Sequence, residues 1–139
     1  MLPMDEPYIY QGISYNTTEN FYQAMKMPKD RLDLRAEFAA MGPHQSKTAS
    51  RNKEKYPIRE DWQSISLQVM NHILRVKFAP GTSWAKKLAE TGKEEIIELN
   101  DWHDTFWGYD INLKRGENNL GKMLMEIREE LKSKKITDE

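Results

Sequence analysis

The sequence predicts a helix-dominated α+β domain, and three observations lead to this class. The chain has 139 residues, the size of one ordinary domain with a single hydrophobic core. Apolar residues recur at intervals of three and four over five segments, as on the buried face of a helix. Short runs of aromatic and β-branched residues predict about three small strands. We expect one domain over residues 1–139, with a flexible tail at 133–139.

The composition narrows the function classes. The 21 Lys and Arg residues nearly balance 22 Asp and Glu residues, so no overall field draws the chain to nucleic acid or to an anionic membrane. The chain has no cysteine, which excludes disulfides, thiolate metal sites and a cysteine nucleophile. No apolar run approaches the roughly 20 residues of a membrane helix, and no signal sequence is recognisable. We therefore expect a cytoplasmic protein without a membrane partner.

The first part of the chain predicts a hairpin followed by a helix. In "PYIYQGISYN", aromatic and β-branched residues alternate around Gly12, which suits a tight turn between two small strands. The helix is expected from about Thr18 to Met27, because Thr17 or Thr18 can cap it and Pro28 ends it. Its first turn carries an acid, which the positive end of the helix dipole favours.

Two further helices follow, and the second has the clearest pattern in the chain. A helix is predicted over Arg31–Met41 with Gly42 as its stop, and Pro43 can open a further short turn. Over Asp61–Phe78, apolar residues recur every three or four positions until "APGT" breaks the pattern. The predicted buried stripe of this central helix consists of Trp62, Ile65, Val69, Ile73 and Val76.

The remainder of the chain predicts two helices and one strand. Thr82 can cap a shorter helix that runs to Thr91 and is closed by Gly92. "EIIEL" is short and rich in β-branched residues, as a strand is. The last helix is expected to have Asn118 or Asn119 as its cap.

The segment "NDWHDTFWGYD", residues 100–110, combines aromatic rings with carboxylates. A core strand would not carry its aspartates, because each buried carboxylate costs several kcal/mol unless it is paired. Tryptophans are equally unusual in a plain surface loop. We therefore interpret the segment as a cleft wall, in which rings hold a flat ligand and acids act on it. The alternative is that the aspartates bond their own backbone in turns and that the rings, Phe106 above all, belong to the core.

Glu19 is a possible partner for an acid of that loop. Taken alone, it is most simply a favourable dipole partner at the start of its helix, worth about 0.3–1 kcal/mol. If the fold brings it together with an aspartate of the loop, the pair suits glycosidic chemistry. One carboxylate then stabilises an oxocarbenium-like sugar, and the other handles a proton or orients water.

Other motifs give weaker signals. The three histidines are too scattered for a metal site, and no nucleophile motif such as GxSxG is present, so we expect neither a metal nor a cofactor. "GENNLG" (116–121) is either an ordinary cap and turn or a helix start whose N–H groups hold an anion. The basic residues of "SKTASRNKEKYPIR" are either solvated surface or contacts to substrate phosphates; they are Lys47, Arg51, Lys53, Lys55 and Arg59.

Four stretches, "TENFYQAMK", "WQSISLQVMNHILRVKF", "DTFWG" and "GENNLGKMLMEIREEL", together resemble one family. In order and spacing they are similar to the NADAR or YbiA-like pattern over residues 14–131. That pattern has an acid followed by an aromatic, Gln, Ala and Lys; then W…VM…KF; then D-x-aromatic-W-G; then G-x-N-x-L-G-x-x-L-M-x-x-R. The resemblance implies a helix-rich α+β fold. It also implies hydrolysis of an N-glycosidic bond in ADP-ribosylated guanine or in a ribosylated intermediate of riboflavin synthesis.

The resemblance further implies roles for individual residues. Glu19 would be the main catalytic carboxylate and Asp104 the second acid. Trp62 would line the pocket, while Trp107 and Gly108 would shape its wall. The residues that match polar family positions are Gln23, Lys26, Lys77, Asn118 and Arg128, and Arg51 matches an arginine expected to contact phosphate.

The chain departs from the family pattern at two places. The strand and Ser-Asn-Phe motif that usually precede the segment equivalent to "ISYNTTE" are not in this sequence, so one side of the pocket is expected to differ. After "WG", the segment "YDINLKRG" is bulkier than the family's glycine-rich turn, so the backbone is expected to approach a ligand less closely.

Three functions remain open from the sequence. The first is a hydrolase whose partner is a small-molecule or nucleic-acid-linked ribosyl or ADP-ribosyl substrate. The second is an ADP-ribose or nucleotide-binding module that has lost catalysis, and the third is a protein-interaction module anchored by the aromatic loop. Retention of both Glu19 and Asp104 favours the hydrolase.

Overall fold

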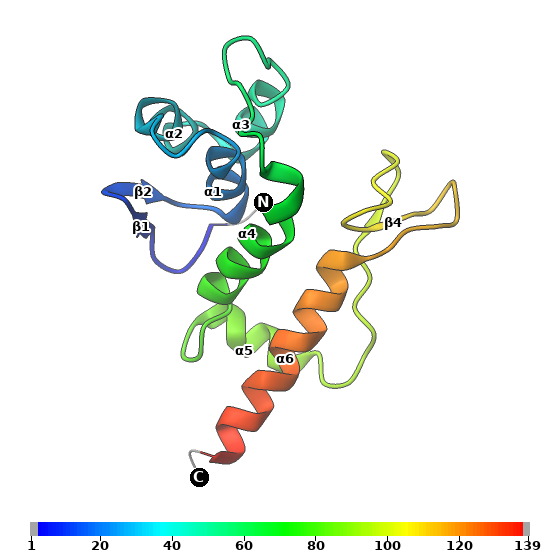
Figure 1. The fold of residues 1–139 in the computed structure, drawn as a ribbon. Coiled ribbons are helices and arrows are strands. Elements are labelled where there is room, and N and C mark those ends of the chain that lie inside the picture. The colour runs from blue at the N-terminus through cyan, green and yellow to red at the C-terminus, as the bar shows by residue number, and fades with distance from the viewer. Residues whose placement is uncertain (1–2, 138–139) are drawn as a thin grey trace. The chain divides into compact units, whose positions relative to one another are not determined.

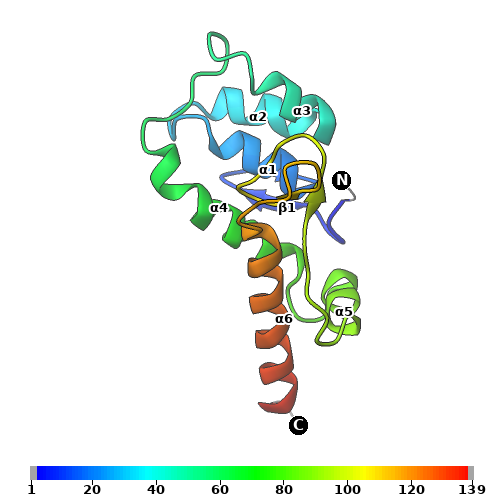
Figure 2. The same ribbon diagram turned by 90° about the vertical axis from the view of Figure 1, so that its right-hand side faces the viewer.

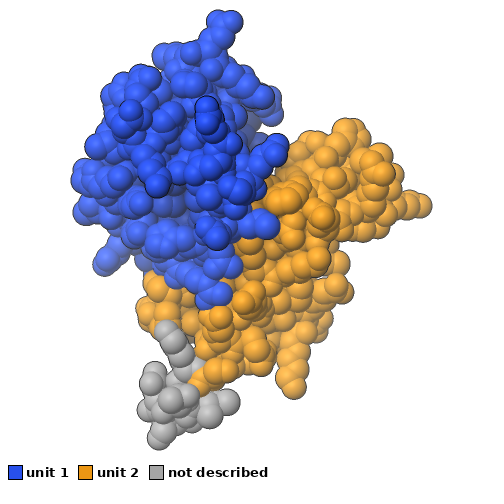
Figure 3. All heavy atoms as spheres, viewed as in Figure 1, with its two compact units in different colours: residues 1–77 blue, residues 78–139 orange. Residues whose placement is uncertain are grey.

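The computed structural model describes residues 3–137 and consists of two compact units, residues 1–77 and 78–139. Figure 3 colours unit 1 blue and unit 2 orange. Within the described residues there are six helices and four short strands, so the predicted helix-dominated α+β class is confirmed with one helix more than expected. Among these same residues, none of the helices is both long and apolar enough to cross a membrane. The single domain expected over residues 1–139 stays a prediction.

Unit 1 begins with the predicted hairpin, β1 (Tyr8–Tyr10) and β2 (Ile13–Tyr15). The two strands are antiparallel. Gln11 and Gly12 form the turn with φ angles of 53° and 76°. A two-residue hairpin loop of type I′ requires such left-handed backbone at both positions, and glycine adopts it without strain. Gly12 therefore acts as the turn residue that the sequence predicted.

Helix α1 (Thr18–Met25) lies at the centre of unit 1. It contacts α2 (Leu32–Ala40), α3 (Pro43–Ala49), α4 (Trp62–Lys77) and β2. Both ribbon views show it in the middle of these elements (Figures 1 and 2). The helix ends two residues before the predicted end. Its central position means that nearly every side chain of α1 takes part in packing.

The buried side chain of Asn20 ties α1 to the end of α2. Asn20 is 2% exposed, and its Nδ2 donates to the carbonyl oxygens of Phe38 at 2.8 Å and Met41 at 2.7 Å. Its Oδ1 accepts from the hydroxyl of Thr17, which is the N-cap of α1. The last carbonyl groups of a helix have no N–H partner within the helix. The Asn20 amide group supplies a donor to the carbonyl groups at this end of α2.

Helix α4 buries a different stripe from the one predicted. Its buried residues are Ser66, Met70, Ile73, Leu74 and Lys77. The predicted stripe shares only Ile73 with this set, and its other four members are half-buried. Apolar residues occupy two adjacent rows of this helix. The periodicity therefore predicts that the segment is a helix. Which of the two rows of side chains is buried depends on how the helix packs against α1.

Unit 2 contains α5 (Ser83–Glu90) and α6 (Asn119–Thr137), which pack together. As predicted, Thr82 caps α5: its side-chain oxygen accepts from the backbone N–H of Ala85 at 3.0 Å. At the other end of α5, the buried Arg128 of α6 donates to the hydroxyl of Thr91 at 2.8 Å. Arg128, which matches a polar family position, thus joins two helices of unit 2.

Helix α6 also extends into the tail expected to be flexible. The helix continues to Thr137, and residues 138 and 139 lie outside the described residues. Apolar residues at helical spacing stop before this end, so the sequence pattern gave no signal for the last turn.

Two very short strands, β3 (Leu99–Asn100) and β4 (Tyr109–Asp110), form a parallel pair at the base of a loop in unit 2. The strand predicted in "EIIEL" is therefore mostly wrong, since only Leu99 of that run is in a strand. Backbone pairing over two residues on each side leaves most of the run without a partner strand.

Asp110 organises the loop around β4. It is 0% exposed; its Oδ1 accepts from the N–H groups of Asn112 at 2.8 Å and Leu113 at 2.7 Å, and its Oδ2 accepts from the N–H of His103 at 2.6 Å. The bond from Leu113, followed by those from His103 and Asn112, holds the pKa of Asp110 below its ordinary value, although burial acts in the opposite direction. A buried carboxylate is tolerated here because backbone donors surround it.

Gly108 and Gly116 allow the backbones of this loop to approach closely. A Cβ on Gly108 would overlap the carbonyl oxygen of Glu98, and a Cβ on Gly116 would overlap the carbonyl oxygen of Gly108. Gly108, expected to shape a pocket wall, is thus required by the folding of the loop itself.

Exchanging Asn20 for Ala is expected to lower the free energy of unfolding by about 2–3 kcal/mol, because the carbonyl groups of Phe38 and Met41 lose the Asn20 amide donor and a small cavity forms. Urea denaturation measures the change. The matched control is Asn16→Ala, because Asn16 is exposed and its described hydrogen bond uses the backbone. Equal stability of the two variants would contradict the role of Asn20.

Exchanging Asp110 for Asn is expected to open the loop, because an amide NH2 group would face a backbone donor. In the parent chain the folded-state pKa is lowered, so ionised Asp110 stabilises the loop above the unfolded-state pKa of about 4. This contribution is lost as the pH falls through the folded-state pKa.

Amide-exchange protection at His103, Asn112 and Leu113 measures both effects. Protection should fall in acid in the parent chain and be low at all pH values in Asp110→Asn. The exposed Asp101 provides the control exchange to Asn. Full protection in Asp110→Asn at neutral pH would show that the carboxylate is not the anchor.

Candidate active site

Glu19 is the one residue of α1 that is not buried. Its Oε1 accepts a hydrogen bond from Nε2 of Gln23 at 3.0 Å. Gln23 lies one turn further along the helix and is 4% exposed, so it is a rigid support for the carboxylate. The positive end of the helix dipole also favours a negative charge in this first turn. Two predicted site residues, Glu19 and Gln23, are therefore in direct contact.

Lys26 lies about two turns after Glu19 on the same side of the helix. Its Nζ is 5.4 Å from the centroid of the Tyr22 ring. Burial lowers the pKa of the Lys26 ammonium group, the Glu19 carboxylate acts in the opposite direction, and Lys47 and Lys53 lower it further. One carboxylate and three ammonium groups thus influence one another in the same region of unit 1.

Trp62, at the start of α4, reaches this region through Tyr22. The two ring centroids are 5.1 Å apart and the ring planes meet at 63°, an edge-to-face contact. Trp62 is half-buried, whereas Tyr22 is buried. The indole is therefore fixed on one side by the core of unit 1 and partly open on the other.

Two further residues that the resemblance assigns to substrate binding differ in exposure. Arg51 is exposed and follows α3. Lys77, in the last turn of α4, is 9% exposed, and burial lowers the pKa of its ammonium group. Arg51 is open to a ligand from solvent, whereas Lys77 is part of the packed face of α4.

Asp104 of unit 2 forms a turn with its own backbone. Its Oδ1 accepts from the N–H groups of Phe106 at 3.1 Å and Trp107 at 2.9 Å. The Asn100 side chain holds the Asp104 backbone from the other side, donating to its carbonyl oxygen at 2.8 Å and accepting from its N–H at 3.0 Å. This is the turn-forming alternative for the aspartates of the loop. Glu19 lies in unit 1 and Asp104 in unit 2, and their pairing stays a prediction.

Glu98 is an acid of unit 2 that the sequence analysis did not single out. Although the residue as a whole is exposed, desolvation of its carboxyl group raises its pKa, and the negative charge of Asp104 raises it further. The raised pKa means that Glu98 keeps its proton to a higher pH than an ordinary glutamate does. The pattern of "EIIEL" predicts a strand, and no local signal in the sequence separates Glu98 from its acidic neighbours.

The aromatic rings of the loop are more exposed than the core interpretation requires. Trp102 is 59% exposed and Phe106 is 40% exposed, so the expectation that Phe106 belongs to the core is wrong. Trp107 is half-buried, with its ring in edge-to-face contact with Phe106 at 4.9 Å. The buried positions of the loop are taken by polar anchors and glycine, which leaves the large rings outside.

Backbone hydrogen bonds join the start of α6 to the aromatic loop. The N–H groups of Asn119 and Leu120 donate to the carbonyl oxygens of Phe106 at 3.2 Å and Trp107 at 3.0 Å. The anion-binding alternative for "GENNLG" is therefore wrong, because carbonyl groups of the aromatic loop already accept from these donors.

Asn118 has a structural role in the same turn. Its Nδ2 donates to the carbonyl oxygen of Ile96 at 2.8 Å, and its Oδ1 accepts from the N–H of Glu98 at 2.9 Å. Both ends of the amide thus bind the backbone of unit 2 instead of capping α6. The predicted contact of Asn118 with substrate stays a prediction.

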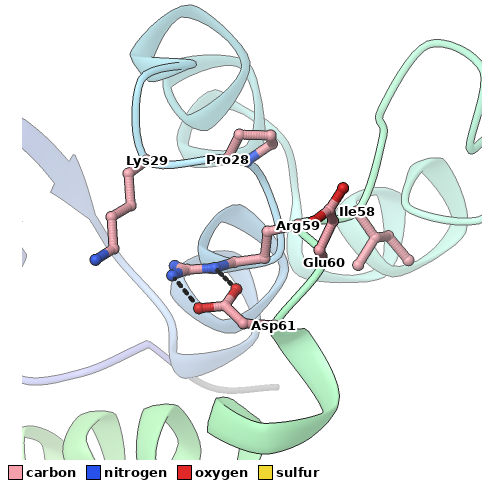
Figure 4. Close-up of a pocket in the computed structure, with 6 residues that line it drawn as sticks. All are labelled: Pro28, Lys29, Ile58, Arg59, Glu60 and Asp61. Carbon is pink, nitrogen blue, oxygen red and sulfur yellow. Dashed lines mark hydrogen bonds and ion pairs between the residues drawn. The ribbon is translucent and has the colours of Figure 1, made fainter.

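A shallow depression of about 650 Å³ lies on unit 1 next to the backbone of Lys26, whose carbonyl oxygen accepts from the N–H of Arg59 at 2.8 Å (Figure 4). In it, the Arg59 guanidinium group forms an ion pair with Asp61, with the NH2 to Oδ2 contact at 2.9 Å. Of the basic residues considered as phosphate contacts, Arg59 lines it; the lining residues are Pro28, Lys29, Ile58, Arg59, Glu60 and Asp61. Because Asp61 already neutralises Arg59, the depression has little attraction for an anion.

Over the part of the chain that the structure describes, no group of three or more His, Asp or Glu side chains is arranged to hold a metal ion. The candidate site of unit 1 therefore consists of a carboxylate, amide, ammonium and aromatic groups. Such groups can stabilise charge, orient water and bind phosphate.

Comparison with known proteins places the chain in a family. The model of the NADAR domain matches residues 3–132, a longer match than the motifs indicated. A riboflavin biosynthesis protein of Vibrio vulnificus is 40% identical over 86% of this chain, which spans 32% of that protein. The N-glycosidase YbiA of Shigella boydii is 34% identical over 90% of this chain and 76% of its own length.

The fold agrees with this relationship. The NMR structure of the Escherichia coli protein YbiA has a TM-score of 0.77 and 30% sequence identity, and the match covers 94% of this chain and 75% of that one. The chain thus belongs to the NADAR family and is an enzyme of the N-glycosidase type.

Proposed function

We propose that this enzyme hydrolyses the bond between a phosphorylated ribose and a nitrogen heterocycle, with Glu19 as its main catalytic carboxylate. The observation that carries the proposal is the position of Glu19. It is the single residue of α1 that is not buried, and Gln23 holds its carboxylate at 3.0 Å. A carboxylate oriented by a buried amide is suited to electrostatic catalysis, because it does not have to reorganise during the reaction.

The proposed chemistry follows from this fixed negative charge. As the C1′–N bond lengthens, the ribose acquires oxocarbenium character, and Glu19 stabilises that positive charge or orients the attacking water. The electron pair of the breaking bond leaves with the heterocycle, which then takes up a proton. Water supplies the hydroxyl group at C1′. Asp104, the second acid that the resemblance implies, is a candidate to assist proton transfer.

The ammonium groups near Glu19 support a phosphorylated sugar as the substrate. Lys47 and Lys53 act electrostatically on Lys26, as Glu19 does with the opposite sign, and the exposed Arg51 follows α3. Phosphate is an anion that lysine and arginine commonly bind. The half-buried Trp62 provides an aromatic face for the heterocycle.

The names of the relatives support a riboflavin-pathway intermediate as the substrate, because the Vibrio relative is a riboflavin biosynthesis protein. The test is to incubate the enzyme separately with a ribosylaminopyrimidine phosphate and with DNA carrying ADP-ribosylated guanine. Chromatography then measures the released base. Release from the first substrate alone supports the pathway intermediate, and release from the DNA alone selects ADP-ribosylated guanine instead. Binding without release from either would favour a non-catalytic nucleotide-binding module.

Exchanging Glu19 for Gln is expected to lower kcat by about 100-fold or more, because the negative charge is lost while the shape of the side chain is kept. Circular dichroism should show an unchanged fold. The measurement is turnover of whichever substrate the preceding assay identifies.

Asp33→Asn is the matched control for this variant. Asp33 is also an acid in the first turn of a helix of unit 1, and it forms an exposed ion pair with Arg31. Its exchange changes a helix-dipole interaction without touching the candidate site, so activity should remain. If Glu19→Gln keeps the activity of the parent enzyme, the proposed role of Glu19 is wrong.

Exchanging Asp104 for Asn separates a catalytic role from a turn-forming role. The amide oxygen can still accept from Phe106 and Trp107, so the turn is expected to survive while the charge is lost. If Asp104 is the second acid, kcat falls by at least about 10-fold with the fold intact. Parent-like activity would restrict Asp104 to the turn.

The same variant has a second readout in Glu98. NMR titration should show a lower pKa for Glu98 than in the parent, because the charge of Asp104 no longer raises it. This shift verifies that the charge was removed from the environment of Glu98, whatever the effect on turnover.

A further inference from the structure

Helix α1 carries two buried amide side chains that are bonded in different ways. Asn20 is 2% exposed, and both its Oδ1 and its Nδ2 have partners in the core of unit 1. Gln23 is 4% exposed, and its Nε2 donates to Oε1 of the half-buried Glu19 at 3.0 Å. The Oε1 of Gln23 is buried without a partner among the described residues. Asn20 thus joins elements of the core, whereas Gln23 bonds a carboxylate that reaches solvent.

The unpaired oxygen of Gln23 is unfavourable for folding. Buried polar atoms are normally hydrogen-bonded, and an unpaired one destabilises the folded state. A methionine of similar volume has no such oxygen and fills irregular gaps in a core, so an apolar side chain would suit the position better. A residue that breaks a packing rule in this way is typical of a functional position.

The carboxylate of Glu19 accounts for the orientation of the amide. If the amide of Gln23 were turned by 180°, its Oε1 would face Oε1 of Glu19, and two acceptors would oppose each other without a proton between them. The observed orientation places an N–H donor against the carboxylate. This is the one hydrogen bond that the Gln23 side chain makes within the part of the chain that the structure describes.

The same hydrogen bond makes the two oxygens of Glu19 different. Oε1 is held by Gln23, which lies one turn further along the same helix. Oε2 makes no hydrogen bond to any residue within 3–137 that the structure describes. Anchoring one oxygen restricts the side-chain torsions of a glutamate and leaves the other oxygen available to a ligand.

We propose that Gln23 is a positioning residue for the hydrolysis: it anchors Oε1 of Glu19, so that Oε2 is the oxygen that acts on the ribose or on the attacking water. The inference rests on the proposed catalytic role of Glu19 and adds an assignment of its two oxygens. Gln23 acts through Glu19 and not by contact with the substrate, because its own side chain is buried. The unpaired oxygen of Gln23 is the loss of stability that accompanies this positioning.

The first test is Gln23→Met, which removes both the donor and the unpaired oxygen. With the ribosylaminopyrimidine phosphate, or with the ADP-ribosylated DNA if only that is cleaved, kcat should fall at least about 10-fold while KM stays within about twofold of the parent. The Tm of the variant should equal or exceed that of the parent, because a buried unpaired acceptor is lost. A crystal structure of Gln23→Met should show Glu19 in more than one rotamer.

The second test is Gln23→Glu, which keeps the shape of the side chain and makes the donor depend on pH. Two carboxyl groups in contact share one proton up to a higher pH than an isolated carboxyl group keeps its own. While the proton is shared, the introduced group can donate to Glu19 in place of the amide; once it is lost, the two carboxylates repel each other. Relative to the parent at the same pH, kcat should therefore rise at least about 5-fold as the pH is lowered from about 8 to about 5. The relative kcat of Gln23→Met should not change with pH.

Gln68 provides the matched controls, because it is an exposed glutamine on a helix of the same unit. Gln68→Met and Gln68→Glu should keep the kcat of the parent at each pH. The positioning role would be overturned by parent-like kcat in Gln23→Met, by a single unchanged rotamer of Glu19 in that variant, or by a relative kcat of Gln23→Glu that is independent of pH. If Glu19→Gln is inactive in the same assays, the proposed function survives such a result, whereas an active Glu19→Gln removes the basis of both.

Discussion

The structure of unit 1 depends on the packing of α1 on almost every side. Seven of its eight residues are buried, and it contacts three helices and a strand. Few positions of a helix packed in this way can carry a functional group, because each polar side chain that points inward needs a hydrogen-bond partner. Asn20 meets this requirement by bonding the end of α2, and Nε2 of Gln23 does so by bonding Glu19, whereas the buried Oε1 of Gln23 makes no hydrogen bond to a described residue. Glu19 is then the single point at which α1 reaches solvent.

This constraint explains why a catalytic carboxylate suits the position. Glu19 lies in the first turn, where the helix dipole favours its charge, and the buried Gln23 limits the rotamers that it can adopt. A carboxylate on a loop would lose side-chain entropy each time it bound a substrate. On α1, folding has already fixed the group, so in the proposed reaction its negative charge would be in place before the sugar develops positive charge.

Unit 2 contains a long loop with little regular structure, which is ordered by side chains. Polar side chains bind the backbone in place of strands: Asp110 accepts from three N–H groups, while Asn100 and Asn118 each hold a neighbouring segment. Because these anchors occupy the interior, Trp102 and Phe106 are left exposed. The combination of acids and rings in the sequence therefore reflects two aspartates, Asp104 and Asp110, that bind the backbone of the loop, and two exposed rings.

The sequence by itself determined the features that depend on residues close together in the chain. The alternation around Gly12, the caps at Thr17 and Thr82 and the helical periodicities were predicted correctly, because each rests on contacts within about one or two turns. The family motifs likewise survive as local patterns. Only the tertiary structure decided which row of α4 is buried, that Phe106 is exposed, and that Asn118 binds Ile96, 22 residues away. Arg35 shows the same limit, since its partner Gln11 is 24 residues distant. The physical reason is that burial and long-range hydrogen bonds are set by the partner element, and local sequence does not specify which element that will be.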